Sequence, residues 1–393
     1  MIRAGAGFSS ALNPRVAAAE ATAGALAQAG LSRAAGALCF ATPAYGAAYP
    51  MILRTVASEA HTREVAGCSS VGVIAGETEI ESGSALAVMV FGGEEIHPKR
   101  FFVPTLRGRS AGVAAEVASA VRPHLGKSNL LVLFADTYNF EAEATVEALA
   151  TELPGVTIAG GGASEDGSIG ETFVFCGDTV SSNAVSGMLL GGDFKLTVAS
   201  SNACGPIGGA HRVTAARDNI LIELDGRPAY EVFAQAAGPL AGDLRRALSY
   251  VFVAIPIYEN AQTIERGQFV VRNIVGASEE HGVIAVAFQP KVGDTVGFVL
   301  RDGERSRQDL KAELEELAER LDSPPAFGLY FDCVSRGAGL YNIPGHDCAY
   351  IRRYLGPIPL AGFFTGFEIG PLGEQPSILQ YSGVLALVSG RKS

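Results

Sequence analysis

An apolar run at residues 37–41 (ALCFA) is followed by a stretch with helical spacing near 49–60 and by a second apolar segment that leads into 67–72 (GCSSVG). Further apolar segments follow and end at 91–93 (FGG). A strand, a helix and a strand joined by short connections favour parallel pairing through a right-handed crossover. The strands that come next can pair antiparallel. This stretch therefore predicts a mixed sheet with helices on its outer faces.

The same order of segments returns twice. The second copy begins at 130–134 (LLVLF) and reaches the loop 160–164 (GGGAS), and the third begins at 327–331 (FGLYF) and reaches 362–370 (GFFTGFEIG). The separation between the first strand and the glycine loop is the same in the first two copies. A fourth, weaker echo spans 251–278. Chance similarity between α/β units is the alternative, but the matched loops favour duplication. We therefore predict an α/β fold with mixed β-sheets flanked by helices and internally duplicated strand-helix-strand units.

The chain of 393 residues is long enough for two domains that each bury a full core. An Asp-Gly pair at 225–226, followed by Pro228, is typical of a turn or a connection rather than of a central strand. We therefore predict a first domain at residues 1–225 and a second domain at residues 226–393.

The composition is that of a folded globular protein, and it limits the partners. Hydrophobic residues make up 48% and charged residues 18%, and the net charge is −11 without any cluster of Lys and Arg. We expect no nucleic-acid partner, because neutralising successive phosphates requires a basic surface. No apolar stretch reaches the roughly 20 residues that a membrane helix needs, so no membrane partner is expected.

The alanine-rich N-terminus predicts a helix and not a targeting signal. Asn13 and Pro14 open a run that ends at Gly30, which is typical of a capped helix with Pro at its first position. Glu20 within this run argues against both a signal peptide and a transit peptide. We therefore expect a cytoplasmic protein.

The cysteines are widely spread and lack the spacing of a zinc site, so we expect reduced, mostly buried thiols and no metal. They are Cys39, Cys68, Cys176, Cys204, Cys333 and Cys348. One alternative function is a cysteine-dependent enzyme acting on a small metabolite, with Cys68 or Cys333 as the nucleophile at a strand end. Against it, the six histidines are scattered and none has the spacing of a catalytic base. A buried, inert thiol is the commoner outcome, so a binding protein is favoured over an enzyme.

Glycine loops at the carboxyl ends of strands are where open α/β sheets bind ligands. Loop 67–72 adds two hydroxyls and a thiol, although its glycines could serve only a tight turn. Arg336 follows a predicted buried strand, and its guanidinium could clamp a carboxylate with two hydrogen bonds. Glu368 could hold an amine, but a structural ion pair with Arg336 is the favoured interpretation. Phe363 and Phe364 are more typical of a core, although one of them could also face a ligand.

The last third of the chain resembles the C-terminal domain of the FIST family at 333–337 (CVSRG) and 356–371 (GPIPLAGFFTGFEIGP). The first part resembles the FIST N-terminal domain at 67–72, 160–163 and 224–229 (LDGRPA). The resemblance therefore spans nearly the whole chain.

Two positions depart from the family pattern. Phe367 stands where Gly is usual, and the acidic position after the Cys-Arg motif is filled by Asp347 instead of Glu. The resemblance implies a sensory module that binds a small ligand, for which an amino acid is the usual suggestion. Some members are reported to bind haem and sense nitric oxide, which gives a second alternative. The resemblance leaves no residues for an output domain, so a signal would pass to a separate signalling protein.

Together these observations predict a small-molecule-binding sensory protein whose ligand is an amino acid or a similar small acid. We expect the ligand at the strand-end glycine loops, between the two halves of the chain. No cofactor is predicted, and haem is required only by the nitric-oxide alternative. The predicted ligand-binding residues are Cys68, Ser69, Ser70, Arg336, Phe364, Thr365 and Glu368.

Overall fold

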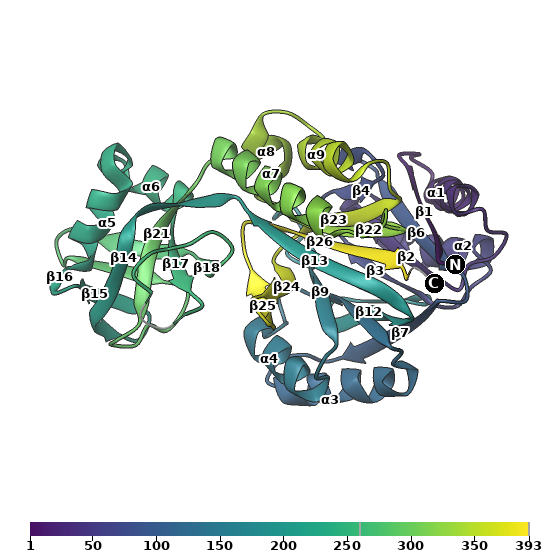
Figure 1. Ribbon diagram of the computed structural model, residues 1–393, viewed down its shortest axis with the longest axis horizontal. Helices are drawn as coiled ribbons and strands as arrows, with labels where there is room; N and C mark the ends of the chain where they lie inside the picture. The colour runs from purple at the N-terminus through teal and green to yellow at the C-terminus, as the bar shows by residue number, and fades with distance from the viewer. Residues whose placement is uncertain (259–260, 392–393) are drawn as a thin grey trace. The chain divides into compact units, whose positions relative to one another are not determined.

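The computed structural model describes residues 1–258 and 261–391 (Figure 1). It forms two compact units. The larger unit contains Met1–Ser200, Lys311–Ile378 and the segment from Ser382 onward, and the smaller unit contains Ser201–Leu310 and Leu379–Tyr381. The boundary expected at 225/226 falls inside the smaller unit, where Asp225 and Gly226 connect two short strands. The division into domains at that position stays a prediction.

The larger unit is built from three repeats of one pattern: strand, helix, strand, helix, strand, hairpin, strand. The first repeat contains β1 (Arg3–Ser9), α1 (Pro14–Ala29), β2 (Gly36–Ala41), α2 (Tyr49–Glu59), β3 (Val65–Ser69), β4 (Val73–Ala75), β5 (Thr78–Ile80) and β6 (Leu86–Gly92). The second contains β7 (Ile96–Pro104), α3 (Ser110–Val121), β8 (Ser128–Ala135), α4 (Ala142–Glu152), β9 (Thr157–Gly162), β10 (Val174–Cys176), β11 (Thr179–Ser181) and β12 (Ala184–Gly192).

The third repeat is interrupted in sequence by the smaller unit, which follows its first strand. The repeat contains β13 (Phe194–Asn202), α7 (Gly303–Arg320), β22 (Phe327–Cys333), α8 (Gly337–Tyr341), α9 (His346–Leu355), β23 (Leu360–Thr365), β24 (Glu368–Leu372), β25 (Gln375–Leu379) and β26 (Ser382–Gly390). Two helices, α8 and α9, thus replace the single crossover helix of the other repeats. The three predicted copies of the strand-helix-strand unit are confirmed.

The repeats form three six-stranded sheets with equivalent strand orders. These orders are β1-β6-β2-β3-β10-β11, β7-β12-β8-β9-β24-β25 and β13-β26-β22-β23-β4-β5. In each sheet the two crossover strands are parallel, and the returning strand pairs antiparallel with the first of them. Each hairpin leaves its own repeat and completes the sheet of another, so the three sheets interlock. The predicted mixed sheets flanked by helices are therefore confirmed.

One glycine recurs at the same position in all three repeats, on the second parallel strand. A Cβ atom at Gly67, Gly160 or Gly362 would lie 1.8, 2.0 or 1.6 Å from a carbonyl oxygen of the neighbouring parallel strand. Backbone cannot move aside as a flexible side chain can. The shared requirement for glycine at matched positions supports a true duplication rather than chance similarity.

Phenylalanines at equivalent positions fill the centre of the larger unit. Phe40, Phe134 and Phe331 lie on the first parallel strand of their repeats, and each packs against Phe363 with ring centroids 4.9, 5.8 and 5.8 Å away. Phe40 and Phe134 also meet edge to face at 5.4 Å. All of these residues are buried, so aromatic packing joins the three sheets.

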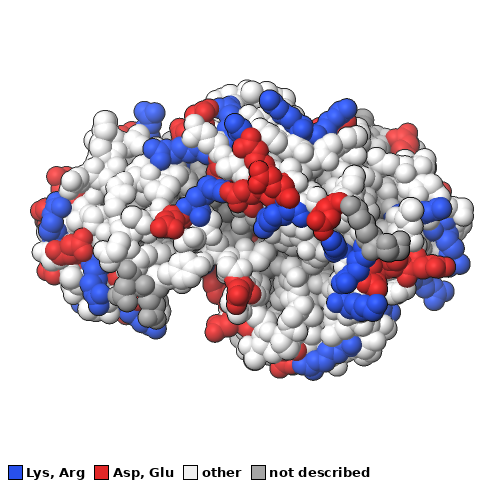
Figure 2. Space-filling model, viewed as in Figure 1, with Lys and Arg blue, Asp and Glu red and all other residues white. Residues whose placement is uncertain are grey.

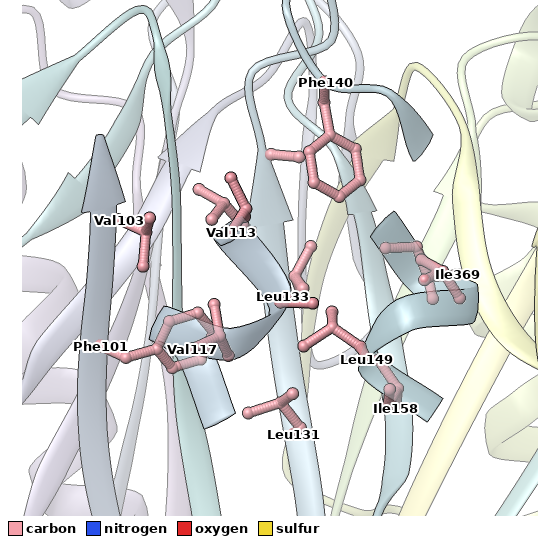
Figure 3. Close-up of a cluster of buried hydrophobic side chains, with 14 of the residues drawn as sticks. Phe101, Val103, Val113, Val117, Leu131, Leu133, Phe140, Leu149, Ile158 and Ile369 are labelled. Carbon is pink, nitrogen blue, oxygen red and sulfur yellow. The ribbon is translucent and has the colours of Figure 1, made fainter. Parts of the chain in front are cut away.

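Helices cover the outer faces of the sheets. In the second repeat, α3 contributes Val113 and Val117 and α4 contributes Leu149 to a core that also includes Leu131 and Leu133 of β8 (Figure 3). On the face shown in Figure 2, acidic and basic side chains are intermixed. None of the helices within the described residues combines the length and apolar character needed to cross a membrane.

The first helix begins and ends as its sequence predicts. The Asn13 side chain accepts hydrogen bonds from the backbone N–H groups of Arg15 and Val16, and Pro14 occupies the first position of the helix. Gly30 ends it in the left-handed conformation, with φ of 62°. These are the cap residues favoured at the two ends of a helix.

The smaller unit has an antiparallel sheet that includes β14 (Cys204–Arg217), β15 (Ile220–Leu224), β17 (Val251–Pro256), β18 (Phe269–Arg272) and β21 (Thr295–Arg301). The fourth repeat expected at 251–278 is wrong. Strand β17 pairs antiparallel with β18 and β21, and the described residues between β17 and β18 contain no helix. An apolar run fixes a strand but not its partner, which explains the error.

Candidate functional site

Each repeat has a corner where its two parallel strands end. The corner is bordered by the start of the crossover helix and by the hairpin received from another repeat, because β10, β24 and β4 pair with β3, β9 and β23. Carboxyl ends of parallel strands are the common ligand-binding edge of α/β sheets. The three corners therefore provide an internal comparison: one framework, filled in three ways.

The first corner, at the ends of β2 and β3, contains an open pocket of about 420 Å³. Ser69 lines this pocket, and its Oγ accepts a hydrogen bond of 2.9 Å from the backbone N–H of Phe173. The ring of Tyr49 packs 5.8 Å from that of Phe173. The pocket is lined by Pro43, Gly46, Ala47, Tyr49, Pro50, Ser69, Ile169, Glu171, Phe173 and Val180.

The second corner, at the ends of β8 and β9, is filled by aromatic rings. Phe140 and Phe367 stack with centroids 6.0 Å apart and planes only 3° from parallel. A Cβ atom added at Gly162 would lie 2.5 Å from the ring of Phe367. Phe367, which the family resemblance predicts to be a departure from the usual pattern, fills the second corner together with Phe140.

The third corner, at the ends of β22 and β23, holds a buried charged cluster. Arg336 Nε lies 2.7 Å from Asp332 Oδ1, and Arg336 Nη2 lies 2.7 Å from Asp347 Oδ2, with all three side chains fully buried. The Tyr330 hydroxyl donates to Asp347 Oδ2 at 2.8 Å. His346 Nδ1 lies 3.1 Å from Asp347 Oδ1. Arg336 is therefore held by side chains of the protein itself.

The two aspartates of this cluster differ in ionisation. Burial raises the pKa of Asp332 well above its ordinary value, and the nearby Asp347 adds to the rise while Arg336 opposes it. Burial also acts to raise the pKa of Asp347, but the charge of Arg336 and hydrogen bonds from His346, Arg336 and Tyr330 hold that pKa below its ordinary value. The pKa values of the two aspartates are therefore shifted in opposite directions, and Arg336 with Asp347 forms the charged pair.

The structure brings several predicted residues together in the core between the corners. Ser70 Oγ lies 2.7 Å from the backbone carbonyl of Phe364 and 2.6 Å from that of Gly72. Thr365 Oγ1 lies 3.0 Å from the carbonyl of Asp332 and 2.5 Å from Glu368 Oε1. These side chains are buried and are hydrogen-bonded within the protein. Of the seven predicted ligand-binding residues, Ser69 lines the pocket described above.

The favoured pairing of Glu368 with Arg336 is wrong. The carboxylate of Glu368 accepts hydrogen bonds from the Thr365 hydroxyl and from the backbone N–H of Ser382. The acidic partners of Arg336 are Asp332 and Asp347. Both of these acids are nearer to Arg336 in sequence than Glu368 is. Glu368 lies at the start of β24, which crosses to pair with β9 of the second sheet.

Cys68 is buried at the end of β3, against β2 and β10. Burial, with a smaller effect of Cys39, raises the pKa of the Cys68 thiol well above its ordinary value. A nucleophilic cysteine needs the opposite shift. Across the described part of the chain, no group of three or more His, Cys, Asp or Glu side chains is arranged to hold a metal ion.

The sequence did not predict the residues that reach the first and third corners from other repeats. Phe173 and Val180 reach the pocket from another repeat, and Glu79 reaches the charged cluster in the same way. The sequence did contain a signal that could have identified Asp332 as a residue of the third corner. Its equivalents in the first two repeats are Ala41 and Ala135, so aligning the repeats would have singled out an acid at an apolar position.

A pH dependence of stability follows from Glu368. Burial raises its pKa from 4.5 to about 8, although hydrogen bonds from Thr365 and Ser382 act against the rise. The folded protein thus holds this proton more tightly than the unfolded chain does. Its contribution to stability is complete below about pH 4.5 and is lost as the pH rises towards about 8, by at most about 1.4 kcal/mol per pH unit.

Glu368→Gln should flatten this loss, because glutamine keeps a polar group at the site without the ionisation. Urea unfolding of both proteins between about pH 5 and pH 8 measures the slope. Glu147→Gln, at an exposed position of α4, is the matched control and should keep the wild-type slope. Equal slopes for wild type and Glu368→Gln would contradict the assignment.

Two protein-family models match the chain and cover most of it. The FIST N domain matches residues 36–227, and the FIST C domain matches residues 229–371. The chain belongs to the FIST family, whose domains are sensory domains.

The chain is also similar to mycobacterial proteins. It is 30% identical over 387 residues to the uncharacterised protein Rv0628c of Mycobacterium tuberculosis H37Rv, a match that covers 98% of this chain and 99% of that protein. It is 31% identical over 322 residues to the uncharacterised protein Mb0898c of Mycobacterium bovis, covering 82% of each. Among solved structures, cyanuric acid hydrolase from A. caulinodans aligns over the whole of both chains with 11% identity and a TM-score of 0.38.

Proposed function

We propose that this protein is a sensor that binds a small molecule in the pocket of the first corner. The observation that carries the proposal is the difference between the corners. The second is filled by Phe140 and Phe367 and the third by the Arg336 cluster, whereas the first is open. Its volume of about 420 Å³ lies within the range of small-molecule sites, roughly 300–1,000 Å³.

The lining of the pocket suggests the chemistry of the ligand. Pro43, Tyr49, Pro50 and Phe173 offer apolar walls that suit a compact apolar body. The Ser69 oxygen accepts the Phe173 N–H, which leaves the hydroxyl hydrogen able to bind an acceptor on the ligand.

The charge of the lining favours an amine. Glu171 is the charged residue among those that line the pocket, and it suits an ammonium group. The small acid expected from Arg336 has a weaker case, since that guanidinium is already bound by Asp332 and Asp347. We therefore place an uncharged molecule or an amine with an apolar body first, including an amino acid bound chiefly through its ammonium group and side chain.

The loop at residues 164–172, which contributes Ile169 and Glu171 to the lining of the pocket, offers a route for the signal. Its two ends are fixed in the core: Ser164 Oγ donates to the Phe364 carbonyl, and Thr172 Oγ1 donates to Asp136 Oδ1 at 2.6 Å. Between them, Ile169 is 48% exposed and Glu171 also faces solvent. A ligand that contacts Ile169 and Glu171 would restrain this exposed segment, which a separate signalling protein could then recognise.

A bulky side chain at Ala47 should block binding. Ala47 lies on the exposed rim of the pocket, so Ala47→Trp fills it with little change to the core. Ligands found by thermal-shift screening of apolar amines, neutral molecules and acids should bind this variant at least about tenfold more weakly, measured by titration calorimetry.

Ala44→Trp is the matched control. Ala44 is exposed on the same 3₁₀ turn (Pro43–Ala48) but does not line the pocket, so this variant should keep wild-type affinity. Undiminished binding to Ala47→Trp would place the ligand elsewhere. A preference for acids over amines would overturn the proposed ligand class.

A further inference from the structure

The third corner is closed by α8, α9 and the turn between them, residues 337–355, which we call the cover. In Figure 1, α8 and α9 lie above β22 and β23. Two carboxylates of the received hairpin bind the backbone of the cover. Glu81 accepts the N–H of Ala338 with its two oxygens at 2.9 and 3.1 Å, and Glu79 Oε1 accepts the N–H of Cys348 at 2.7 Å.

The fold itself does not require a carboxylate at position 79. Glu79 pairs with Ile74 in the hairpin received by the third sheet, as Val180 pairs with Phe175 in the hairpin received by the first. The same framework position thus carries an apolar residue at one corner and a buried acid at another. Burying an acid is costly, so its presence indicates a role specific to the third corner.

Several acids surround Glu79, and the groups facing it come from every element that packs around it. Asp347 and the Cys348 thiol come from α9, and Asp332 comes from β22. Glu81 lies on the same hairpin. Arg336, at the start of α8, is the buried cation of the cluster and is already bound to both aspartates.

Two oxygens of this cluster lack a hydrogen-bond partner among the described groups. They are Glu79 Oε2 and Asp332 Oδ2, and both are buried. An ionised Glu79 and the ionised Asp347 would repel each other strongly in this setting, where little water screens them. A proton on Glu79 removes that repulsion and still leaves Oε1 able to accept the Cys348 N–H.

Aromatic stacking joins the two helices of the cover. His346 is stacked between Tyr341 and Tyr350, with ring centroids 3.9 and 4.4 Å apart, which ties α8 to α9. The turn 342–344 is exposed, and Ile343 is 52% exposed. The outer end of the cover carries the surface ion pair between Arg352 and Glu77.

We propose that Glu79 and the cover form a proton-dependent latch, so that pH is a second input to this protein beside the ligand of the first corner. With Glu79 protonated the cover stays closed over the third corner. Ionisation of Glu79 next to Asp347 favours opening, which exposes the carboxylate to water and frees the surface of α8 and α9. This input is independent of the proposed ligand pocket.

The pH range of the latch follows from the two states of Glu79. In the closed state burial, followed by the charge of Asp347, raises its pKa from 4.5 to about 7, although the bond from Cys348 N–H opposes the rise. In the open state the solvated group returns to its ordinary value. Closure is therefore favoured below about pH 4.5, and the opening constant rises by at most about tenfold per pH unit between about pH 5 and pH 7, then levels off.

Amide hydrogen exchange measured by mass spectrometry tests the latch in the full chain without ligand. Helix α4, the crossover helix of the second repeat, supplies the baseline for the intrinsic effect of pH on exchange. The exchange rate of residues 338–349 relative to α4 should rise about 40-fold between about pH 5 and pH 7. A ratio that stays constant over this range would overturn the proposal.

Matched variants separate the latch from other causes. Glu79→Gln keeps a polar group and should make the ratio independent of pH, as should Glu79→Val, which copies the residue of the first corner. Glu77→Gln removes the surface ion pair and should keep the full rise. An undiminished rise in both Glu79 variants would refute the latch. Ala47→Trp should show the wild-type rise, so failure of the ligand pocket leaves this test unaffected.

Discussion

Replacing Arg336 with alanine should lower the free energy of unfolding by about 3–5 kcal/mol, because it leaves Asp347 as a buried charge without its partner. The sequence predicts that Arg336 binds a carboxylate of the ligand. Its side chain is instead fully buried between Asp332 and Asp347. Urea unfolding near pH 7 measures the loss directly.

Arg352→Ala provides the contrast for this prediction. Arg352 lies on α9 with Asp347 and pairs with Glu77, but both partners are more than half exposed. Surface ion pairs of this kind contribute about 0–1 kcal/mol, so the variant should be close to wild type. Similar losses of unfolding free energy in the two variants would show that burial of Arg336 does not determine its contribution to stability. Wild-type stability of Arg336→Ala would show that Asp347 is not charged in the folded protein.

Replacing Gly362 with alanine should destabilise the protein by at least about 3 kcal/mol, at or beyond the upper end of the range for overpacking, and could prevent folding. The added Cβ would lie 1.6 Å from the carbonyl oxygen of Tyr330, and neither strand can retreat without breaking the parallel pair. The soluble yield and urea unfolding of the variant measure the effect.

Gly339→Ala is the matched control and should act in the opposite direction. Gly339 lies in α8, where no atom stands within 4 Å of an added Cβ. Alanine is favoured over glycine in a helix by roughly 0.5–1 kcal/mol, so this variant should be slightly more stable than wild type. A mild effect of Gly362→Ala, comparable to that of Gly339→Ala, would mean that the parallel strands are not as close as the structure has them.

Much of the larger unit could be predicted because its signals are local. Asn13, Pro14 and Gly30 define α1 within their own stretch of chain, and the apolar runs at 37–41, 130–134 and 327–331 each became a parallel strand. Duplication strengthened the prediction by repeating each signal. The echo at 251–278 failed because the described residues after its apolar run contain no crossover helix that would define the partner strand.

The site could be predicted less well. Ser69 lines the pocket, yet the loop that completes the pocket comes from the second repeat and carries no sequence signal for that contact. Arg336 was predicted to bind a ligand, and the structure places its guanidinium between Asp332 and Asp347. Phe367 was noted as a departure from the family, and the structure shows which corner it fills.

The sequence by itself determined the repeats, the strand and helix order of each, the glycines where parallel strands meet, and the family. These features depend on propensity and periodicity within a few neighbouring residues, or on a motif read in one piece. Only the tertiary structure decided that each hairpin crosses to another sheet, that Asp347 rather than Glu368 neutralises Arg336, and that Glu79 binds the backbone of Cys348. These contacts join residues far apart in the chain, so they depend on packing and charge in three dimensions. The same framework therefore has one open corner, one filled by aromatic rings and one that contains buried acids.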